Sequence, residues 1–289
     1  MAASATRWAH ASGELDCSRG RLVGIVNATP DSFTDGGAHH GTERAVAHGL
    51  RLAAQGADVV EVGGESLRFA PHTDVAVEIA RVEPVVRRLA ALLSVPVAVD
   101  TFKPAVAAAA IAAGASILND PTGLRDPEMR RVAAEAGVGV VIAHFAGEPK
   151  VRPPAFPDVD VPAAVLAWAR RTIRLAEEAG IPPERLVIDP GVGLGKSPPQ
   201  DLDLLHRLAE LRALGRPILV PISNKKVIGA VTGAPAKRRL AGTAAALVWC
   251  RARGATLFRV HNVKFLRGSL EMAEALASGR AERWHQVVK

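Results

Sequence analysis

Side chains that can bind a polar ligand recur along the chain, each at the end of a short apolar run or in the loop beyond it. They are Asn27, Arg68, Asp100, Asn119, His144, Asp189, Lys225, Arg259 and His261. The carboxylates of Asp100 and Asp189 and the amide of Asn119 favour a flat ring rich in N–H donors over a phosphate, which the carboxylates would repel. Lys225, Arg259 and His261 are donors or cations and favour anionic oxygens. A ligand with a nitrogen-rich ring at one end and a phosphate group at the other matches this polarity.

Other kinds of site fit the sequence less well. The glycine-rich run at 191–197 resembles a phosphate loop, but Pro190 stands where that motif needs glycine, and the dinucleotide spacing is also missing. We expect these glycines to form a sharp turn over the ring-binding end. His39 and His40 have no third metal ligand nearby, which favours a solvated loop pair. No serine or cysteine lies in a nucleophile elbow.

Apolar runs of strand length precede these polar residues at regular intervals. The predicted strands are Leu22–Val26, Asp58–Val62, Val95–Val99, Ser116–Leu118, Val138–Ala143, Leu186–Ile188, Pro217–Pro221 and Thr256–Val260. Their continuous apolar character is typical of parallel strands buried on both faces. Eight strands alternating with helices in one continuous chain predict an α/β fold, a single (β/α)₈ TIM barrel, although a doubly wound open sheet could also hold them. In the barrel, all the polar strand ends meet at one mouth.

Helical periodicity fills the intervals between the strands. The predicted helices are Thr42–Gln55, Asp74–Leu93, Pro104–Ala113, Glu128–Ala136, Ala163–Ala179, Leu202–Leu214 and Gly242–Arg253, and several are followed by a glycine. The Pro-rich run 148–162 predicts a mobile loop. We divide the chain into an N-terminal extension (1–20), the barrel (21–280) and a C-terminal tail (281–289).

Composition excludes several classes of protein. The chain has 289 residues, 48% of them hydrophobic and 22% charged, which is typical of a globular fold with a large core. Its net charge of +7 comes without a dense basic block, so we expect no nucleic-acid partner. We find no secretory signal and no apolar run long enough for a membrane helix. The two cysteines, Cys17 and Cys250, lie far apart and fit a reducing compartment, so we expect a cytoplasmic protein without a membrane partner.

A series of short motifs gives the chain a family resemblance from about Leu22 to Leu276. In order, they are Asn27-Ala-Thr-Pro-Asp-Ser-Phe33 with Asp35-Gly-Gly37, Gly63-Gly-Glu-Ser66 with Arg68, Val99-Asp-Thr101, Asn119-Asp120, Asp189-Pro-Gly191 with Gly193, Gly195 and Lys196, then Lys225, and Arg259-Val-His261. With these motifs the chain resembles the dihydropteroate synthases of the pterin-binding barrel group. Any one motif alone would be weak, but the whole series on successive strand ends is specific.

The resemblance implies an activity and assigns a role to each matching residue. The expected enzyme is a transferase of folate biosynthesis that condenses 6-hydroxymethyl-7,8-dihydropterin diphosphate with p-aminobenzoate to 7,8-dihydropteroate and pyrophosphate. The implied pterin-binding residues are Asp100, Asn119, Asp189 and Lys225, and the implied diphosphate-binding residues are Asn27, Arg259 and His261. Asn27 is also the implied ligand of Mg²⁺, the expected cofactor. A homodimer is expected as well.

On the acceptor side, the resemblance implies that Arg68 and Lys226 bind p-aminobenzoate and that Asp35, Arg68 and Lys225 take part in catalysis. Diphosphate is expected to leave first, giving a pterin cation that the neutral amine attacks. Such a path needs positioning and charge stabilisation more than a protein nucleophile.

The chain also departs from the family pattern around the acceptor. Leu67 and Phe69 flank Arg68 where the family usually has Thr and Pro, and Asn224 and Lys226 replace an Arg and a Ser. Exchanging a planar, stacking guanidinium for an amide is not conservative. These changes leave open a synthase with a modified acceptor site and lower sulfonamide sensitivity, or a diverged paralogue that is inactive or uses another amine. A methyl-folate:corrinoid methyltransferase and a non-catalytic pterin-binding protein also remain; the retained diphosphate set disfavours the methyltransferase.

Overall fold

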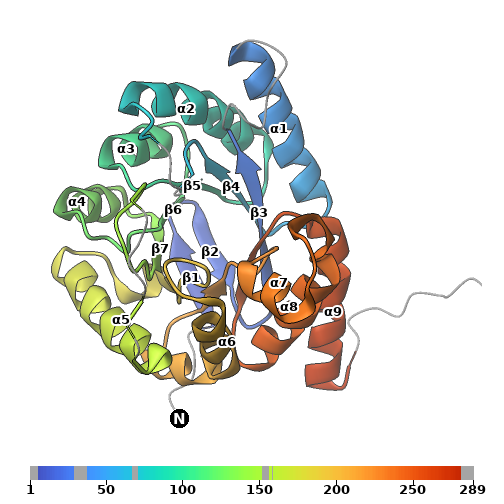
Figure 1. Ribbon diagram of the computed structural model, residues 1–289. Coiled ribbons are helices and arrows are strands. Elements are labelled where there is room, and N and C mark those ends of the chain that lie inside the picture. Colours follow the sequence, from blue (N-terminus) through green and yellow to red (C-terminus); the bar gives the residue numbers. More distant parts are fainter. Residues whose placement is uncertain (1–5, 29–37, 67–70, 152–155, 158, 281–289) are drawn as a thin grey trace, which may run out of the picture.

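The computed structural model describes residues 6–28, 38–66, 71–151, 156–157 and 159–280. Eight parallel strands form one sheet in the order β8-β7-β6-β5-β4-β3-β10-β9. A parallel bridge between Ile188 and Ile218 joins the two ends of this order and closes the sheet on itself. Helices surround the strands on all sides (Figure 1). The predicted (β/α)₈ barrel is therefore confirmed.

The barrel strands are short and almost entirely buried. They are β3 (Arg21–Asn27), β4 (Val59–Gly63), β5 (Val97–Asp100), β6 (Ile117–Asp120), β7 (Gly139–Ala143), β8 (Leu186–Asp189), β9 (Leu219–Val220) and β10 (Leu257–Val260). Every residue of β4, β6, β7 and β8 is buried, as the continuous apolar runs predict for strands covered on both faces.

The outer layer consists of helices, most of which lie near predicted positions. They are α1 (Ala38–Ala54), α2 (Val75–Leu92), α3 (Pro104–Ala112), α4 (Pro127–Ala136), α5 (Val161–Glu178), α6 (Pro198–His206), α7 (Lys226–Thr232), α8 (Leu240–Ala252) and α9 (Val263–Ser278). Asp74, Asp126 and Asp160 each cap a helix by accepting a hydrogen bond from a backbone N–H of its first turn.

Three local features differ from the sequence predictions. The single helix expected over 202–214 is divided into α6 and the 3₁₀ helix η3 (Leu208–Leu214). The short helix α7 and the last helix, α9, had no predicted range. His39 and His40 belong to the first turn of α1 rather than to a loop. The structure describes their backbone but not their side chains. Residues 152–155 and 158 of the predicted mobile loop also lie outside them.

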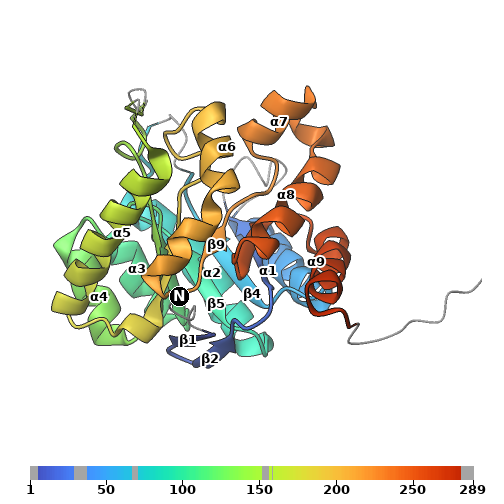
Figure 2. The same cartoon turned by 90° about the horizontal axis from the view of Figure 1, so that it is seen from below.

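A β-hairpin formed by β1 (Arg7–His10) and β2 (Gly13–Asp16) covers the end of the barrel where the strands begin (Figure 2). Trp8 is only 1% exposed, and its Nε1 donates to the carbonyl of Arg185 at 2.8 Å. Together with Cys17 it packs on the innermost side chains of the strands. The residues that we placed in an N-terminal extension thus close one end of the barrel.

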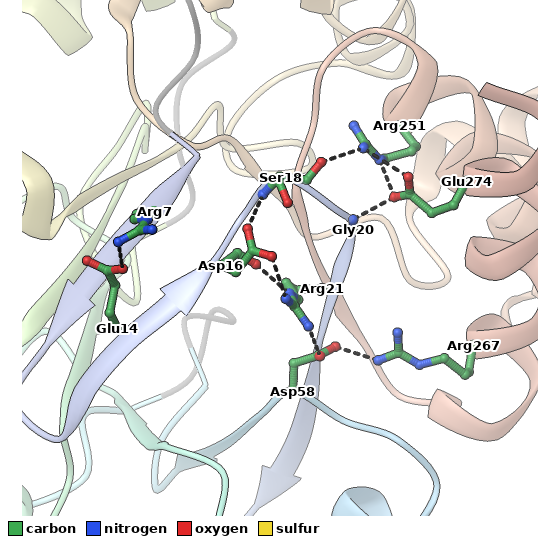
Figure 3. Close-up of polar contacts among 10 residues, drawn as sticks. All are labelled: Arg7, Glu14, Asp16, Ser18, Gly20, Arg21, Asp58, Arg251, Arg267 and Glu274. Atoms are coloured by element: carbon green, nitrogen blue, oxygen red, sulfur yellow. Dashed lines mark hydrogen bonds and ion pairs between the residues drawn. The ribbon is translucent and has the colours of Figure 1, made fainter. Parts of the chain in front are cut away.

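Charged side chains attach this hairpin segment to the barrel (Figure 3). Arg21 contacts Asp58 at 3.0 Å, and Asp58 also pairs with Arg267 of α9. The amide of Gly20 donates to Glu274 of α9 at 2.6 Å. The first and last parts of the described chain are thereby joined at the same end of the barrel.

Candidate functional site

The polar strand ends meet in a cavity of about 60 Å³ inside the barrel, at the end opposite the hairpin. Its lining includes five of the predicted binding residues: Asp100, Asn119, Asp189, Lys225 and Arg259. They come from β5, β6, β8, the loop after β9, and β10. The convergence expected from a barrel is therefore observed for the ring-binding set and for one residue of the anion-binding set.

The strand period explains why these side chains point inward together. The innermost apolar layer above the hairpin contains Val59, Ala98, Ile117, Val187 and Leu257. Alternate residues of a strand share a face, so the residue two positions further along each strand also points into the barrel. These next residues are Glu61, Asp100, Asn119, Asp189 and Arg259. A polar layer thus lies directly on an apolar one.

Four members of the polar layer form a connected network. Arg259 Nε lies 2.5 Å from Oε1 of Glu61, and its Nη2 lies 2.6 Å from Oδ2 of Asp100. Asn119 Nδ2 donates to Oε2 of Glu61 at 2.9 Å. Within the described residues, Oδ1 of Asn119 is buried and accepts no hydrogen bond. A ligand N–H that donates to this oxygen would satisfy it.

Burial sets the ionisation of this cavity. It raises the pKa of Asp100 to about 7 against the opposing effect of Arg259, and the pKa of Asp189 to about 6 against the amide of Gly191 and the charge of Lys225. Burial also lowers the pKa of Lys225. Perturbed carboxylates and a perturbed lysine together in a concave pocket indicate a functional site.

The glycine-rich segment after β8 turns sharply beside the cavity, and its Leu194 lines one wall. The amide of Gly191 donates to Oδ1 of Asp189 at 2.7 Å and fixes that carboxylate. Gly191 has φ +73°, and a Cβ there would lie 1.8 Å from the carbonyl oxygen of His144. Gly193 has φ +76° and lies against the side chain of Lys225. Only glycine permits this conformation at so close an approach.

A buried lysine joins this wall to the loop after β7. Lys196 Nζ lies 2.9 Å from Nδ1 of His144 and donates to the carbonyl of Gly191 at 2.9 Å. Burial, reinforced by the charge of Lys196, lowers the pKa of His144 to about 3, so the imidazole is neutral and its Nδ1 accepts. Burial lowers the pKa of Lys196 to about 8. This contact stabilises the wall beside Asp189.

The remaining anion-binding candidates lie at the exposed rim. Asn27 ends β3 and His261 follows β10, and these two strands are neighbours in the barrel. His261 Nδ1 lies 2.9 Å from Oγ of Ser223, which connects the rim to the loop after β9. Both side chains are exposed, as a site for a charged leaving group at the mouth requires.

The predicted acceptor residues are only partly described. Lys226 is exposed at the first position of α7, and Asn224 beside it has φ +56°. Asp35 and Arg68 lie outside the described residues, as do Leu67 and Phe69, which flank Arg68.

A second polar cluster supports the base of the loop that precedes Arg68. Lys103 Nζ lies 2.6 Å from Glu65 and 2.8 Å from Glu78, while Lys150 Nζ lies 3.0 Å from Glu65. Burial alone would raise the pKa of Glu65, but hydrogen bonds from Lys103, the Thr73 amide and Lys150 lower it to about 2. These contacts join the loops after β4, β5 and β7.

A larger cavity, of about 620 Å³, lies at the opposite end of the barrel, beside the hairpin. Its arginines at positions 21 and 267 both pair with Asp58. We assign the site to the smaller cavity because unsatisfied and perturbed polar groups converge there. Within the described part of the chain, no group of three histidine, cysteine or acidic side chains could hold a metal ion. In that part, too, no helix is both long and apolar enough to cross a membrane.

Sequence comparison identifies proteins similar to this chain. The family described as pterin binding enzyme matches residues 23–261. The chain is 38% identical over 273 residues to dihydropteroate synthase of Escherichia coli strain K12, covering 94% of this chain and 97% of that protein. It is 45% identical over 262 residues to a probable bifunctional folylpolyglutamate synthase/dihydropteroate synthase of Halobacterium salinarum, covering 90% of this chain but only 32% of that protein.

Solved structures give the same result. Dihydropteroate synthase of Xanthomonas albilineans with 4-aminobenzoic acid has a TM-score of 0.89 at 44% identity, covering 95% of this chain and 99% of that one. The same enzyme in complex with 7,8-dihydropteroate has a TM-score of 0.85 at 43% identity, covering 94% and 99% of the two chains.

Proposed function

The chain belongs to the family of pterin-binding enzymes, and from this premise we infer how its barrel mouth works. The protein catalyses the dihydropteroate synthase reaction, which joins 6-hydroxymethyl-7,8-dihydropterin diphosphate to p-aminobenzoate and releases pyrophosphate. The observation that carries this conclusion is the cavity where Asp100, Asn119, Asp189, Lys225 and Arg259 converge.

The ring is proposed to bind at the bottom of the mouth. Ionised Asp100 and Asp189 accept N–H groups of the pterin, and the unfilled Oδ1 of Asn119 accepts another. The Lys225 side chain donates to a ring acceptor from the loop after β9. Because these groups are fixed by the strands and by the Gly191 amide, they hold the reactive methylene carbon in one place.

The diphosphate is proposed to extend from there to the rim. Arg259, Asn27 and His261 would bind its oxygens, and they stabilise the negative charge that builds up as the bond breaks. The carbon–oxygen bond of the methylene group breaks first, and its electron pair leaves with the diphosphate. The amine of p-aminobenzoate then supplies the pair for the new carbon–nitrogen bond and loses a proton. Asp35, Arg68 and Lys226 are proposed to serve this acceptor step.

A magnesium ion is proposed to arrive with the diphosphate. Asn27 is exposed at the end of β3, and its side chain carries an amide oxygen, a ligand type that suits Mg²⁺. The described residues hold no cluster that could bind a metal ion without further ligands, so phosphate oxygens and water would complete the coordination. When bound, the ion neutralises charge on the leaving diphosphate.

A homodimer is also proposed. Phe265, Met272 and Leu276 occupy one face of α9, spaced seven and four residues apart, and are 49%, 57% and 68% exposed. Helix α9 packs on the outside of the barrel (Figure 1). An exposed apolar face of this kind is typical of an interface between subunits.

The first experiment measures pyrophosphate release from pterin diphosphate with Mg²⁺, with and without p-aminobenzoate. Acceptor-dependent release with formation of dihydropteroate is the expected result. Binding of pterin diphosphate without acceptor-dependent release would favour a diverged paralogue or a non-catalytic binding protein. Methyl transfer from a methyl-folate to a corrinoid would indicate the methyltransferase, which the diphosphate-binding set disfavours.

A further inference from the structure

Among the five residues of the polar layer, Glu61 has no role assigned so far, and the other four line the cavity. It lies in β4 with 1% of its surface exposed, two residues after Val59 of the apolar layer. Both of its carboxylate oxygens are occupied: Oε1 by Arg259 Nε at 2.5 Å and Oε2 by Asn119 Nδ2 at 2.9 Å. A carboxylate this deeply buried is costly unless hydrogen bonds and an opposite charge compensate it.

The two partners of Glu61 belong to opposite halves of the site. Asn119 is assigned to the pterin ring and Arg259 to the diphosphate. The contact with Asn119 also fixes which way its amide faces: with Nδ2 donating to Glu61, Oδ1 faces the cavity as an acceptor. The contact at Nε leaves the far end of the guanidinium directed towards Asp100 and the mouth.

We propose that Glu61 is a positioning residue for the condensation: its buried carboxylate holds Asn119 and Arg259 at a fixed separation, so that ring and diphosphate bind in register. The assignment rests on the proposed function, because it uses the two halves of that substrate. Glu61 contacts neither reacting atom and acts only through its two partners. Because Glu61 holds both Asn119 and Arg259, the binding of the pterin ring and the binding of the diphosphate both depend on it. An ion pair with only a structural role would affect neither.

The charge of Glu61 also reaches Asp100. Burial raises the pKa of Asp100 most, the charges of Glu61, Glu78 and Asp120 raise it further, and Arg259 lowers it. Lys225 of the loop after β9 also interacts with Asp100. Removing the negative charge of Glu61 therefore lowers the pKa of Asp100. A purely structural change would not move this value in a defined direction.

The test compares Glu61→Gln with wild type and with Glu178→Gln, a matched change on the exposed surface of α5. Binding of two separate probes is measured by calorimetry: the pterin alcohol, which carries only the ring, and inorganic pyrophosphate with Mg²⁺. Gln keeps the shape but presents an N–H₂ to one of its two donor partners. We expect both probes to bind roughly 10- to 100-fold more weakly to Glu61→Gln and unchanged to Glu178→Gln.

The pH profile gives the second readout. For Glu61→Gln, we expect the acidic limb of kcat/KM for pterin diphosphate to shift to lower pH than in wild type. Wild-type affinity for either probe, or an acidic limb that stays in place, would overturn the proposal. If Glu61→Gln does not fold, Glu61→Asp decides: its carboxylate keeps the charge but is shorter, so weakened binding of both probes supports the proposal and wild-type affinity for either rejects it.

This design separates the proposal from the enzyme's activity. Turnover by the wild-type protein tests the synthase reaction, while probe binding tests Glu61 even where no turnover occurs.

Discussion

Nη2 of Arg259 lies 2.6 Å from Oδ2 of Asp100, so a cation proposed for the diphosphate contacts a carboxylate proposed for the pterin ring. Even with this cation beside it, burial raises the pKa of Asp100 to about 7. The protonation of the site therefore changes near neutral pH, which makes its function sensitive to small changes in pH.

We expect kcat/KM for pterin diphosphate to fall as the pH is lowered through about 7 and then about 6, the pKa values of Asp100 and Asp189. Both pKa values are raised, so each group is ionised above its value and protonated below it. A protonated carboxyl group cannot accept all the ring N–H bonds that the carboxylate accepts. Initial rates at saturating p-aminobenzoate test this; an acidic limb near 4, the ordinary range of aspartate, would contradict it.

Gly191→Ala is expected to destabilise the protein by about 3 kcal/mol or more, because it combines a left-handed backbone with a steric overlap. The added Cβ would lie 1.8 Å from the carbonyl oxygen of His144. Gly215→Ala is the matched control: its φ is +65°, but a Cβ there meets nothing within 4 Å, so only about 1 kcal/mol is expected. Urea unfolding compares the two variants, and equal losses would show that the overlap is relieved without cost.

Asn224→Arg is expected to lower KM for pterin diphosphate, because a planar guanidinium can stack on the ring face. The same change should reduce the free energy of unfolding by about 1 kcal/mol, since Asn224 has φ +56° and asparagine tolerates this region better than arginine. Asn224→Ala separates the two effects: it should lose similar stability without any gain in KM. An unchanged KM in Asn224→Arg would place residue 224 away from the ring.

Lys226→Met is expected to raise KM for p-aminobenzoate and to weaken sulfonamide inhibition by a similar factor, about two- to fivefold. Lys226 is exposed, and an exposed ion pair with a carboxylate contributes only about 0.2–1 kcal/mol. Lys237→Met, at another exposed position, should leave both quantities unchanged. A changed KM for pterin diphosphate, with that for p-aminobenzoate constant, would remove Lys226 from the acceptor site.

The proposed dimer predicts a native mass of twice 30.3 kDa by light scattering. Met272→Glu should shift this mass towards the monomer, because it buries a charge in the proposed interface. Leu92→Glu on α2 is a control at a side chain of comparable exposure, 59% against 57%, and should not change the mass. A monomeric wild-type protein would disprove the dimer directly.

Local patterns predict much of this architecture. A parallel strand buried on both faces gives a continuous apolar run, and the residue that follows it lies at the mouth, so Asp100, Asn119 and Asp189 could be placed from sequence alone. The cavity lined by these residues together with Lys225 and Arg259 confirms their convergence. Their individual roles remain proposals.

Long-range contacts could not be predicted in the same way. Glu61 lies inside an apolar run, and its partner Arg259 is 198 residues away. The sequence therefore shows a charged residue in a strand but does not reveal the contact that compensates its charge. The hairpin was missed because its strands are four residues long and one of them is mostly exposed. Trp8 becomes buried only after the barrel provides the layer on which it packs.

The joining of the hairpin segment to α9 has a consequence for synthesis of the chain on the ribosome. Gly20 emerges 254 residues before its hydrogen-bond partner Glu274. Arg251, which also contacts Glu274, emerges nearly as late. The nascent barrel therefore cannot form these contacts until α9 has been synthesised, and a chain that stops short of α9 cannot attach the hairpin segment in this way.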